Sequence, residues 1–339
     1  MSTQHARRSV FTARRNAFTL VELLISILIV SILSGLVLFT MTGAMEVAYR
    51  EKTRSQIVKL DRVISGLWNS YFSRRIFLDV DSVIDPLSPE FQGDLEAAKN
   101  LRNFRNQRRL DALRELLRTE LPDRKADVED PPADSSGRSA VAQAYYDFAD
   151  SVEREPPEEN GIRGWNIAYQ GAECLYMIIT LNARPGPRGF TILSDDEVGD
   201  VDDDGMPEIL DAWGNPIEFL RWAPGLVSPK QTRDRSKPDP FDPHNVYAEQ
   251  HGTFVLYPYI YSAGPDRIYD TFPGAYKTDS TYTALHYSGE DPPNNPYLSV
   301  SFSHFDEPVV LQVGAPIDFD DDGKLDNADN IHNHLIGGR

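Results

Sequence analysis

The segment from Phe18 to Met41 reads FTLVELLISILIVSILSGLVLFTM and decides how the rest of the chain is interpreted. Its 24 positions contain one ionisable residue, Glu22. An α-helix rises about 1.5 Å per residue, so a helix of this length crosses a hydrocarbon core of about 30 Å. The sequence therefore predicts a transmembrane helix over residues 18–41.

Residues 1–17 precede this span and carry four arginines and no acidic residue. Positive charge beside an apolar span favours the cytoplasmic side of a membrane. We therefore expect a cytoplasmic leader peptide, with everything after Met41 on the opposite side. A cleaved secretory signal is the alternative, because Thr42, Gly43 and Ala44 are small enough for a signal peptidase. The apolar region of such a signal, however, normally spans only about 7 to 15 residues.

Glu22 is unusual in this setting, because a carboxylate inside an apolar span costs about 2.5 to 3.5 kcal/mol on insertion scales. One explanation is that it lies near the cytoplasmic end and reaches the membrane surface, as in a plain signal anchor. The other comes from the string AFTLVELL over residues 17–24, which resembles the processing site of type IV prepilins and pseudopilins. That family usually has glycine where this chain has Ala17.

The resemblance implies a role for each of three residues. A prepilin peptidase is expected to cut after Ala17 and to methylate the new amine of Phe18. Glu22 then becomes the fifth residue of the mature chain. Its implied role is in assembly, where its carboxylate meets the N-terminal ammonium of a neighbouring subunit and neutralises both charges within the membrane.

The charge balance narrows the range of partners. The chain has 34 lysines and arginines against 52 acidic residues, a formal net charge of −18, and removal of the four leader arginines lowers it to −22. A chain this acidic repels polyanions, so nucleic acid is excluded as a partner, whereas cations, basic surfaces and further copies of the chain are favoured. The single cysteine, Cys174, excludes an internal disulfide and any multi-cysteine metal site.

The helical pattern continues beyond the apolar span. Apolar residues recur at steps of three and four, with charged residues between them: Ile57, Leu60, Ile64, Leu67 and Tyr71. This spacing predicts an amphipathic continuation of the helix over residues 42–75, with an apolar stripe that needs a cover. In the pilin-like family the cover is a small antiparallel sheet. The strand candidates are residues 217–222, 253–261, 297–302 and 309–313.

Two further helices are predicted between these elements, at residues 89–121 and 139–153, within an inserted helical region over residues 76–165. One face of the first carries four leucines, which we expect to pack on the domain rather than to form a coiled coil: Leu110, Leu113, Leu117 and Leu121. A short buried helix is predicted at residues 171–182, with Cys174 in the core. Residues 166–339 are expected to form a C-terminal pseudopilin-like α+β region with acidic loops.

The segment from Asp318 to Asp329 reads DFDDDGKLDNAD and places carboxylates at positions 1, 3, 5, 9 and 12, with glycine at 6. This is the spacing of an EF-hand-type calcium loop, in which alternate groups converge on one hard cation. With aspartate at position 12 it resembles the loops of dockerin modules. The candidate calcium ligands are Asp318, Asp320, Asp322, Lys324, Asp326 and Asp329.

A second copy of the pattern, DVDDDGMPEILD, runs from Asp200 to Asp211. Its candidate ligands are Asp200, Asp202, Asp204, Met206, Glu208 and Asp211. Pro207 at position 8 argues against a paired EF-hand, because such loops pair through a backbone N–H that proline lacks. For both loops the alternative is a solvated acidic turn, since aspartate and glycine are common turn formers.

These loops lie beside a second family resemblance. The strings DAWGNP at 211–216 and SAGPD at 262–266 resemble the D-x-W-G-x-P and S-x-G-x-D elements of the major pseudopilin of type II secretion systems. In that family the second element opens a calcium loop that ends in consecutive aspartates before an isoleucine. Residues 329–331, DNI, resemble this ending. The resemblance implies calcium-site roles for Ser262, Asp266 and Asp329, and insertions at 272–308 and over much of 77–163.

The sequence contains no Gly-rich phosphate loop, G-x-S-x-G elbow or H-E-x-x-H helix. Its seven histidines are dispersed. We expect His332 and His334 to be exposed tail residues; the alternative is that this closely spaced pair binds a soft metal. No catalytic residue is predicted, and the protein is expected not to be an enzyme.

The pilin-like resemblance implies an α+β fold, with the long N-terminal helix packed on a small antiparallel sheet. It also implies a single-pass inner-membrane protein with a cytoplasmic N-terminus and a periplasmic C-terminal region, working as a calcium-stabilised subunit of a type II secretion pseudopilus or a type IV pilus-like fibre. The implied partners are a prepilin peptidase, other pilin or pseudopilin subunits and an inner-membrane assembly platform. The alternative is a signal-anchored, exported, calcium-stabilised binding or adhesion protein that does not polymerise. An exported hydrolase with an acidic metal site is a third possibility.

Overall fold

The computed structural model describes residues 19–76, 95–132, 137–154, 165, 167–182, 193–246, 252–273, 275–278, 281–284, 296–297, 300–304, 307–317 and 329–336. The chain divides into two compact units, Met1–Ala48 and Tyr49–Arg339. Each unit is described by itself.

Helix α1 (Leu20–Tyr71) contains 52 residues and begins in the first unit. It begins with a reciprocal capping arrangement, because Thr19 N donates to Glu22 Oε2 at 2.9 Å and Glu22 N donates to Thr19 Oγ1 at 3.2 Å. The apolar side chains described along its first half are exposed. The helix is long and apolar enough to cross a membrane.

The second unit begins in the C-terminal half of α1, whose apolar stripe enters the core. The predicted stripe is confirmed at Ile57, Leu60, Ile64 and Tyr71, which are buried, whereas Leu67 is only partly buried and Trp68 takes the core position beside it. Polar groups also hold this half of the helix. Gln56 Nε2 donates to Leu210 O at 3.1 Å, and Lys59 forms an ion pair with Glu197 at 2.9 Å.

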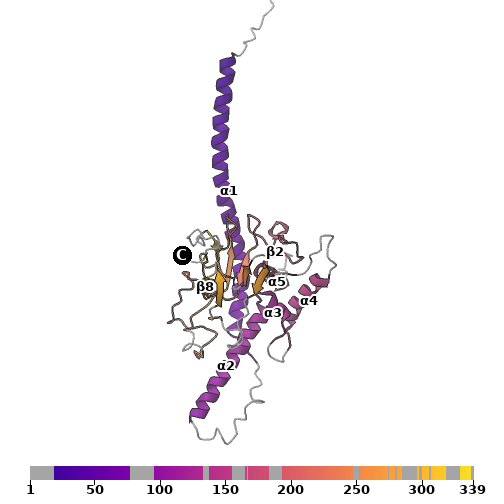
Figure 1. Cartoon of the computed structure of the whole chain (residues 1–339), viewed down its shortest axis with the longest axis vertical. Helices are drawn as coiled ribbons and strands as arrows, with labels where there is room; N and C mark the ends of the chain where they lie inside the picture. Colours follow the sequence, from indigo (N-terminus) through magenta and orange to yellow (C-terminus); the bar gives the residue numbers. More distant parts are fainter. Residues whose placement is uncertain are drawn as a thin grey trace, which may run out of the picture. The chain divides into compact units, whose positions relative to one another are not determined.

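Four further α-helices are described: α2 (Leu95–Glu120), α3 (Lys125–Glu129), α4 (Ala140–Arg154) and α5 (Gln170–Asn182). The predicted helices at 89–121, 139–153 and 171–182 correspond to α2, α4 and α5. The four leucines of α2 and its end are buried in the main core, and so is Cys174 of α5. α5 packs against β2 and β3, and Figure 1 shows α2 running away from the strands at the centre of this unit.

The described strands pair in four small antiparallel groups. β1 (Val198–Gly199) follows the short 3-10 helix η2 (Asp195–Glu197) and pairs with β2 (Glu208–Ile209). The three-stranded sheet has the order β3 (Glu218–Leu220), β4 (Tyr259–Ser262) and β9 (Ile331–His332). Two hairpins complete the set, β5 (Ala275–Thr278) with β6 (Thr281–Ala284) and β7 (Val300–His304) with β8 (Glu307–Leu311). The predicted α+β class, a long N-terminal helix with small antiparallel sheets and further helices, is confirmed.

The predicted strand at 253–261 is wrong over its first part, because only its end lies in β4. The preceding residues bond to loops instead of to a strand. Val255 N donates to Lys237 O at 3.1 Å, and Tyr257 N donates to the side chain of Gln231 at 3.0 Å. Pro258 has no N–H to donate, which stops a ladder at that position.

The expectation that His332 and His334 are exposed is also wrong. β9 pairs with β4 so that His332 lies opposite Tyr261, and both histidines are buried. The ring of His334 is fixed by Ser228 Oγ at Nδ1 (2.9 Å) and by Pro258 O at Nε2 (3.0 Å). This long-range strand pairing has no local signal in the sequence.

Both histidines should remain neutral at pH 5, where ordinary histidines are protonated. Burial lowers the pKa of His332 to about 4 and that of His334 to about 3. Because these pKa values lie below the unfolded value of about 6.5, the stability that the neutral rings contribute is complete above pH 6.5. It is lost as the pH falls toward 4 for His332 and toward 3 for His334. Histidine ring shifts in NMR spectra of the labelled protein in detergent micelles check this. A titration midpoint near 6.5 for either ring would contradict it.

Candidate functional site

The amino-terminal candidate site is described in part. Ala17 and Phe18 lie outside the described residues, so the predicted cut and methylation remain predictions. Glu22 lies in the first turn of α1, where its Oε2 also accepts a hydrogen bond from Thr19 Oγ1 at 2.9 Å. The neighbouring apolar side chains Leu20 and Leu23 are exposed. The structure therefore places one carboxylate at the start of a long, uncovered apolar helix.

The loop from Asp200 to Asp211 folds around its own first carboxylate. Asp200 accepts hydrogen bonds from the backbone N–H of Asp204 at 3.1 Å and from that of Gly205 at 2.9 Å. Asp204 accepts one from Met206 N at 2.8 Å. Gly205 has a φ of +96°, a conformation that glycine adopts without a steric penalty. The glycine at position 6 therefore makes the sharp turn that the loop pattern predicts.

Carboxylates gather inside this loop. Oxygen atoms of Asp200, Asp202 and Glu208 lie within 4.8 Å of one another. Burial raises the pKa of Glu208 to about 8, against the hydrogen bond from Val201 N, and the charge of Asp202 adds to the increase. The Met206 side chain is buried in the core, so this residue can reach a hard cation only through its backbone carbonyl. Of the predicted ligands, Asp200, Asp202 and Glu208 therefore lie in one group, and Asp204 lies with Asp202 in a second.

The remaining predicted ligand of this loop, Asp211, belongs to neither described carboxylate group. Its Oδ1 accepts hydrogen bonds from Trp213 N at 2.8 Å and Asn215 N at 2.9 Å. Its Oδ2 accepts from Asn215 Nδ2 at 3.1 Å and from Ser262 Oγ at 2.7 Å. Asp211 thus orders the turn that follows it and ties that turn to β4.

A model of the prokaryotic N-terminal methylation motif matches residues 12–38. The matched range includes Ala17, Phe18 and Glu22. The chain carries the N-terminal motif of type IV pilin-like proteins. The motif implies processing by a prepilin peptidase and assembly with other pilins, and together with the apolar half of α1 it indicates membrane anchoring. No curated protein and no solved structure matches the chain.

The two pseudopilin-like elements lie together, since Ser262 of one bonds to Asp211 of the other. The third element, residues 329–331, lies beside these two, although a long stretch of chain separates it from them in the sequence. Ser262 pairs with Ile331, and a Cβ on Gly264 would lie 3.0 Å from the backbone oxygen of Asp329. Burial raises the pKa of Asp329, and a hydrogen bond to Asp266 adds to the increase. Asp266 and Asp329 are thus adjacent, whereas the hydroxyl of Ser262 is bonded to Asp211.

The C-terminal acidic loop is described only at its last residue, Asp329. The other five candidate ligands lie outside the described residues: Asp318, Asp320, Asp322, Lys324 and Asp326. Their assignment to calcium remains a prediction.

Sequence reasoning missed one carboxylate, Glu173 of α5. An oxygen of Glu173 lies within 4.8 Å of oxygens of Asp202 and Asp204. Burial, followed by the charge of Asp204, raises the pKa of Glu173 to about 10. The signal that was available is the presence of an acidic residue within an otherwise apolar helix, because such a residue needs a partner.

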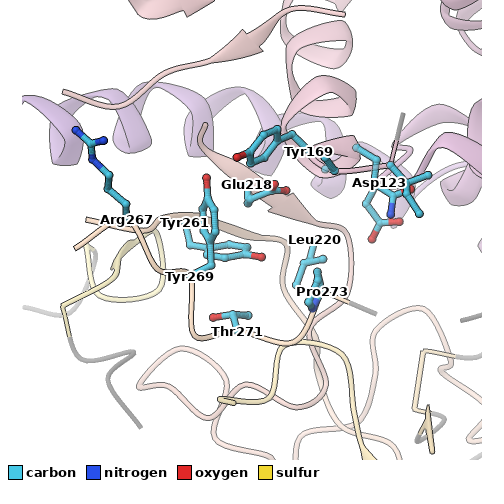
Figure 2. A pocket seen from close by; sticks show the side chains of 13 residues that line it. Asp123, Tyr169, Glu218, Leu220, Tyr261, Arg267, Tyr269, Thr271 and Pro273 are labelled. Carbon is cyan, nitrogen blue, oxygen red and sulfur yellow. The ribbon is translucent and has the colours of Figure 1, made fainter. Parts of the chain in front are cut away.

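A cavity of about 280 Å³ lies at the start of α5, and Figure 2 shows its side chains. Glu218 within it points at the helix start, because a Cβ on Gly171 would lie 2.4 Å from Glu218 Oε2. Burial raises the pKa of Glu218 to about 8, against backbone hydrogen bonds from Phe219 and Ala172. The carboxyl group therefore caps α5. The described lining residues include no serine, cysteine or histidine.

Proposed function

We propose that the protein is a membrane-anchored structural subunit of a pilus-like fibre, with the pseudopilus of a type II secretion apparatus as the leading version and a type IV pilus as the second. The observation that carries the proposal is the methylation motif at residues 12–38. The subunit is held in the inner membrane, with its leader in the cytoplasm and the unit from Tyr49 on the periplasmic side. Its work is assembly rather than catalysis, with a prepilin peptidase, other pilin-like subunits and an inner-membrane platform as partners.

The secretion version is supported by the contact between the two pseudopilin-like elements. The hydrogen bond from Ser262 to Asp211 and the adjacency of Asp266 and Asp329 bring together residues from all three motif strings. We further propose that calcium binds at Asp266, Asp329 and the acidic loop that precedes Asp329. A bound cation offsets the mutual repulsion of carboxylates held this close.

The second candidate is an exported, calcium-stabilised binding or adhesion protein that keeps its N-terminal anchor and does not polymerise. The observation that favours it is the large share of the chain outside the motif strings, including α2 and α4. The two candidates differ in the state of the N-terminus, because a plain anchor is not cut at Ala17.

When the chain is expressed with a prepilin peptidase, the mature protein should begin at Phe18 and carry one methyl group on its amine. The reason is that the motif supplies a small residue before the cut and Glu22 after it. Intact-mass and N-terminal peptide mass spectrometry measure this directly. The control is Ala17→Arg, which places a long charged side chain before the cut and should retain the leader. An intact wild-type N-terminus would support the plain anchor, and a start at Met45 would indicate a secreted soluble protein.

A further inference from the structure

The Asp200–Asp211 loop lacks its usual closing ligand. In an EF-hand-type loop the carboxylate at position 12 completes the oxygen shell around the ion. Here that residue is Asp211, whose two oxygens accept four hydrogen bonds from Trp213, Asn215 and Ser262. Withdrawing Asp211 to bind a cation would break the turn and its tie to β4. Of the positions that bind the ion in an EF-hand-type loop, this loop therefore offers carboxylates at 1, 3, 5 and 9.

Glu173, on α5, lies beside this loop. Its side chain is fully buried, with 0% of its surface exposed. The indole N–H of Trp165 donates to Glu173 Oε2, while Oε1 has no hydrogen-bond partner among the residues that the structure describes. A carboxylate oxygen of Glu173 lies within 4.8 Å of oxygens from Asp202 and Asp204. Trp165 therefore fixes the carboxylate while one oxygen remains available to a ligand.

Glu208 shows the same combination of burial and an unused oxygen. Its surface is also 0% exposed, and its Oε2 accepts a hydrogen bond from Val201 N at 3.0 Å. Its Oε1 has no partner within the described part of the chain. Leaving a buried carboxyl oxygen without a hydrogen-bond partner destabilises the folded protein. Two such oxygens beside three aspartates make a cation the simplest way to satisfy the cluster.

The chemistry of the donors favours Ca²⁺. All five side chains offer carboxylate oxygens, which hard cations prefer, and the described cluster contains no histidine or cysteine to favour zinc. Ca²⁺ binds oxygen at about 2.3 to 2.6 Å, so oxygens on opposite sides of one ion are about 4.8 Å apart. The corresponding span across Mg²⁺ is only about 4.1 Å. Within each of the two groups, Glu173 with Asp202 and Asp204 and Asp200 with Asp202 and Glu208, the oxygens lie no farther apart than the width of one calcium shell, and Asp202 belongs to both groups.

We propose that Glu173 replaces Asp211 as the closing ligand of a calcium site formed with Asp200, Asp202, Asp204 and Glu208. The site joins the β1–β2 loop to α5, which packs against β2 and β3. This site depends on the proposed function only for the identity of the cation, calcium. It is separate from the site proposed at Asp266 and Asp329. Calcium then orders this loop against the core whether or not the chain enters a fibre.

The test uses the full-length protein in non-ionic detergent, with melting temperature measured in CaCl₂ and in chelator at matched ionic strength. Wild type should gain a few degrees in Tm at calcium concentrations well above Kd. Glu173→Gln keeps the size of the side chain and an acceptor for Trp165. It should be about as stable as wild type in chelator, because the buried carboxyl group is already neutral without a cation. It should lose the part of the calcium shift that this site contributes. An undiminished shift in this variant overturns the proposal.

Asp211→Asn is the matched variant, because it changes the residue that the loop pattern alone would choose. It should lower Tm equally in calcium and in chelator and keep the calcium shift. Loss of the shift in Asp211→Asn with retention in Glu173→Gln overturns the proposal in favour of an ordinary loop site. The pair Asp320→Asn with Asp322→Asn tests the C-terminal loop separately. A wild-type protein without any calcium shift but with a methylated Phe18 overturns both calcium sites and leaves the fibre proposal standing.

Terbium gives a second readout, because Tb³⁺ takes calcium sites and emits when a nearby indole is excited. Trp165 donates to Glu173, so a Tb³⁺ ion in this site lies beside its ring. Excitation of tryptophan should produce Tb³⁺ emission that excess Ca²⁺ removes. The emission should fall by more than half in Trp165→Phe and in Glu173→Gln. Equal emission from wild type and both variants contradicts the assignment of Glu173.

Discussion

Replacing Glu22 with glutamine should prevent the protein from entering fibres while leaving its insertion into the membrane intact. The proposed role of Glu22 is to pair with the N-terminal ammonium of a neighbouring subunit within the apolar layer. An unpaired charge there costs about 2.5 to 3.5 kcal/mol, which corresponds to a roughly 100-fold loss of incorporation. Insertion should be unchanged or improved, because the variant removes a charge from the apolar span.

Glutamine is the sharper choice because Glu22 has a second role. It caps α1 through its hydrogen bonds with Thr19, and glutamine serves in the same capping arrangement. A loss of assembly in Glu22→Gln therefore reports the charge rather than fraying of the helix end. Crosslinking into oligomers, beside wild type and in the same cells, measures incorporation. Glu51→Gln, at an exposed position further along α1, is the control and should assemble normally. Normal crosslinking of Glu22→Gln would exclude the pairing role.

The elements that the sequence predicts well are those with a local repeat. The apolar run and the stripe at Ile57, Leu60 and Ile64 depend on spacing along one helix, and they appear in α1 as expected. The same is true of the leucine face of α2. A period of three and four residues fixes which side of a helix is apolar, so the buried side follows from the sequence alone.

The features that escaped prediction depend on contacts between distant parts of the chain. Glu173 gives no spacing signal toward the loop that begins at Asp200, because α5 brings it there only after folding. Asp211 shows the converse, since the loop pattern places it among the ligands while its hydrogen bonds go to its own turn and to Ser262. Spacing identifies which residues can bind a cation. Tertiary packing decides which of them are still available.

The second large effect expected is on stability. Arg221→Met should lower the free energy of unfolding by about 3 to 5 kcal/mol, because it removes the cation closest to two buried carboxylates, Asp123 and Asp127. Their other cationic neighbours, Arg124 and Arg118, lie farther away, at 4.0 and 3.8 Å. Arg221 lies just after β3, and its Nη1 donates to Asp127 Oδ2 at 2.8 Å and to Leu121 O at 2.9 Å. Its backbone N–H donates to Asp123 Oδ2 at 2.8 Å. Burial raises the pKa of Asp123, whereas at Asp127 the charges of Arg221 and Arg124 outweigh burial and lower the pKa.

Urea unfolding of the full-length protein in non-ionic detergent, followed by tryptophan fluorescence, measures this effect. Arg102→Met, at an exposed position on α2, is the control and should change stability by less than about 0.5 kcal/mol. The triple variant Arg221→Met, Asp123→Asn and Asp127→Asn should regain part of the stability that Arg221→Met loses. Its two buried partners no longer carry a charge, and the effects of substitutions at interacting groups do not simply add. A single variant as stable as the control would show that the ion cluster does not hold the α2–α3 segment to the sheet. The expected loss of stability would instead show that the α2–α3 segment is an integral part of the Tyr49–Arg339 unit. The segment would then be attached to the sheet through the buried charge of Arg221, beside β3.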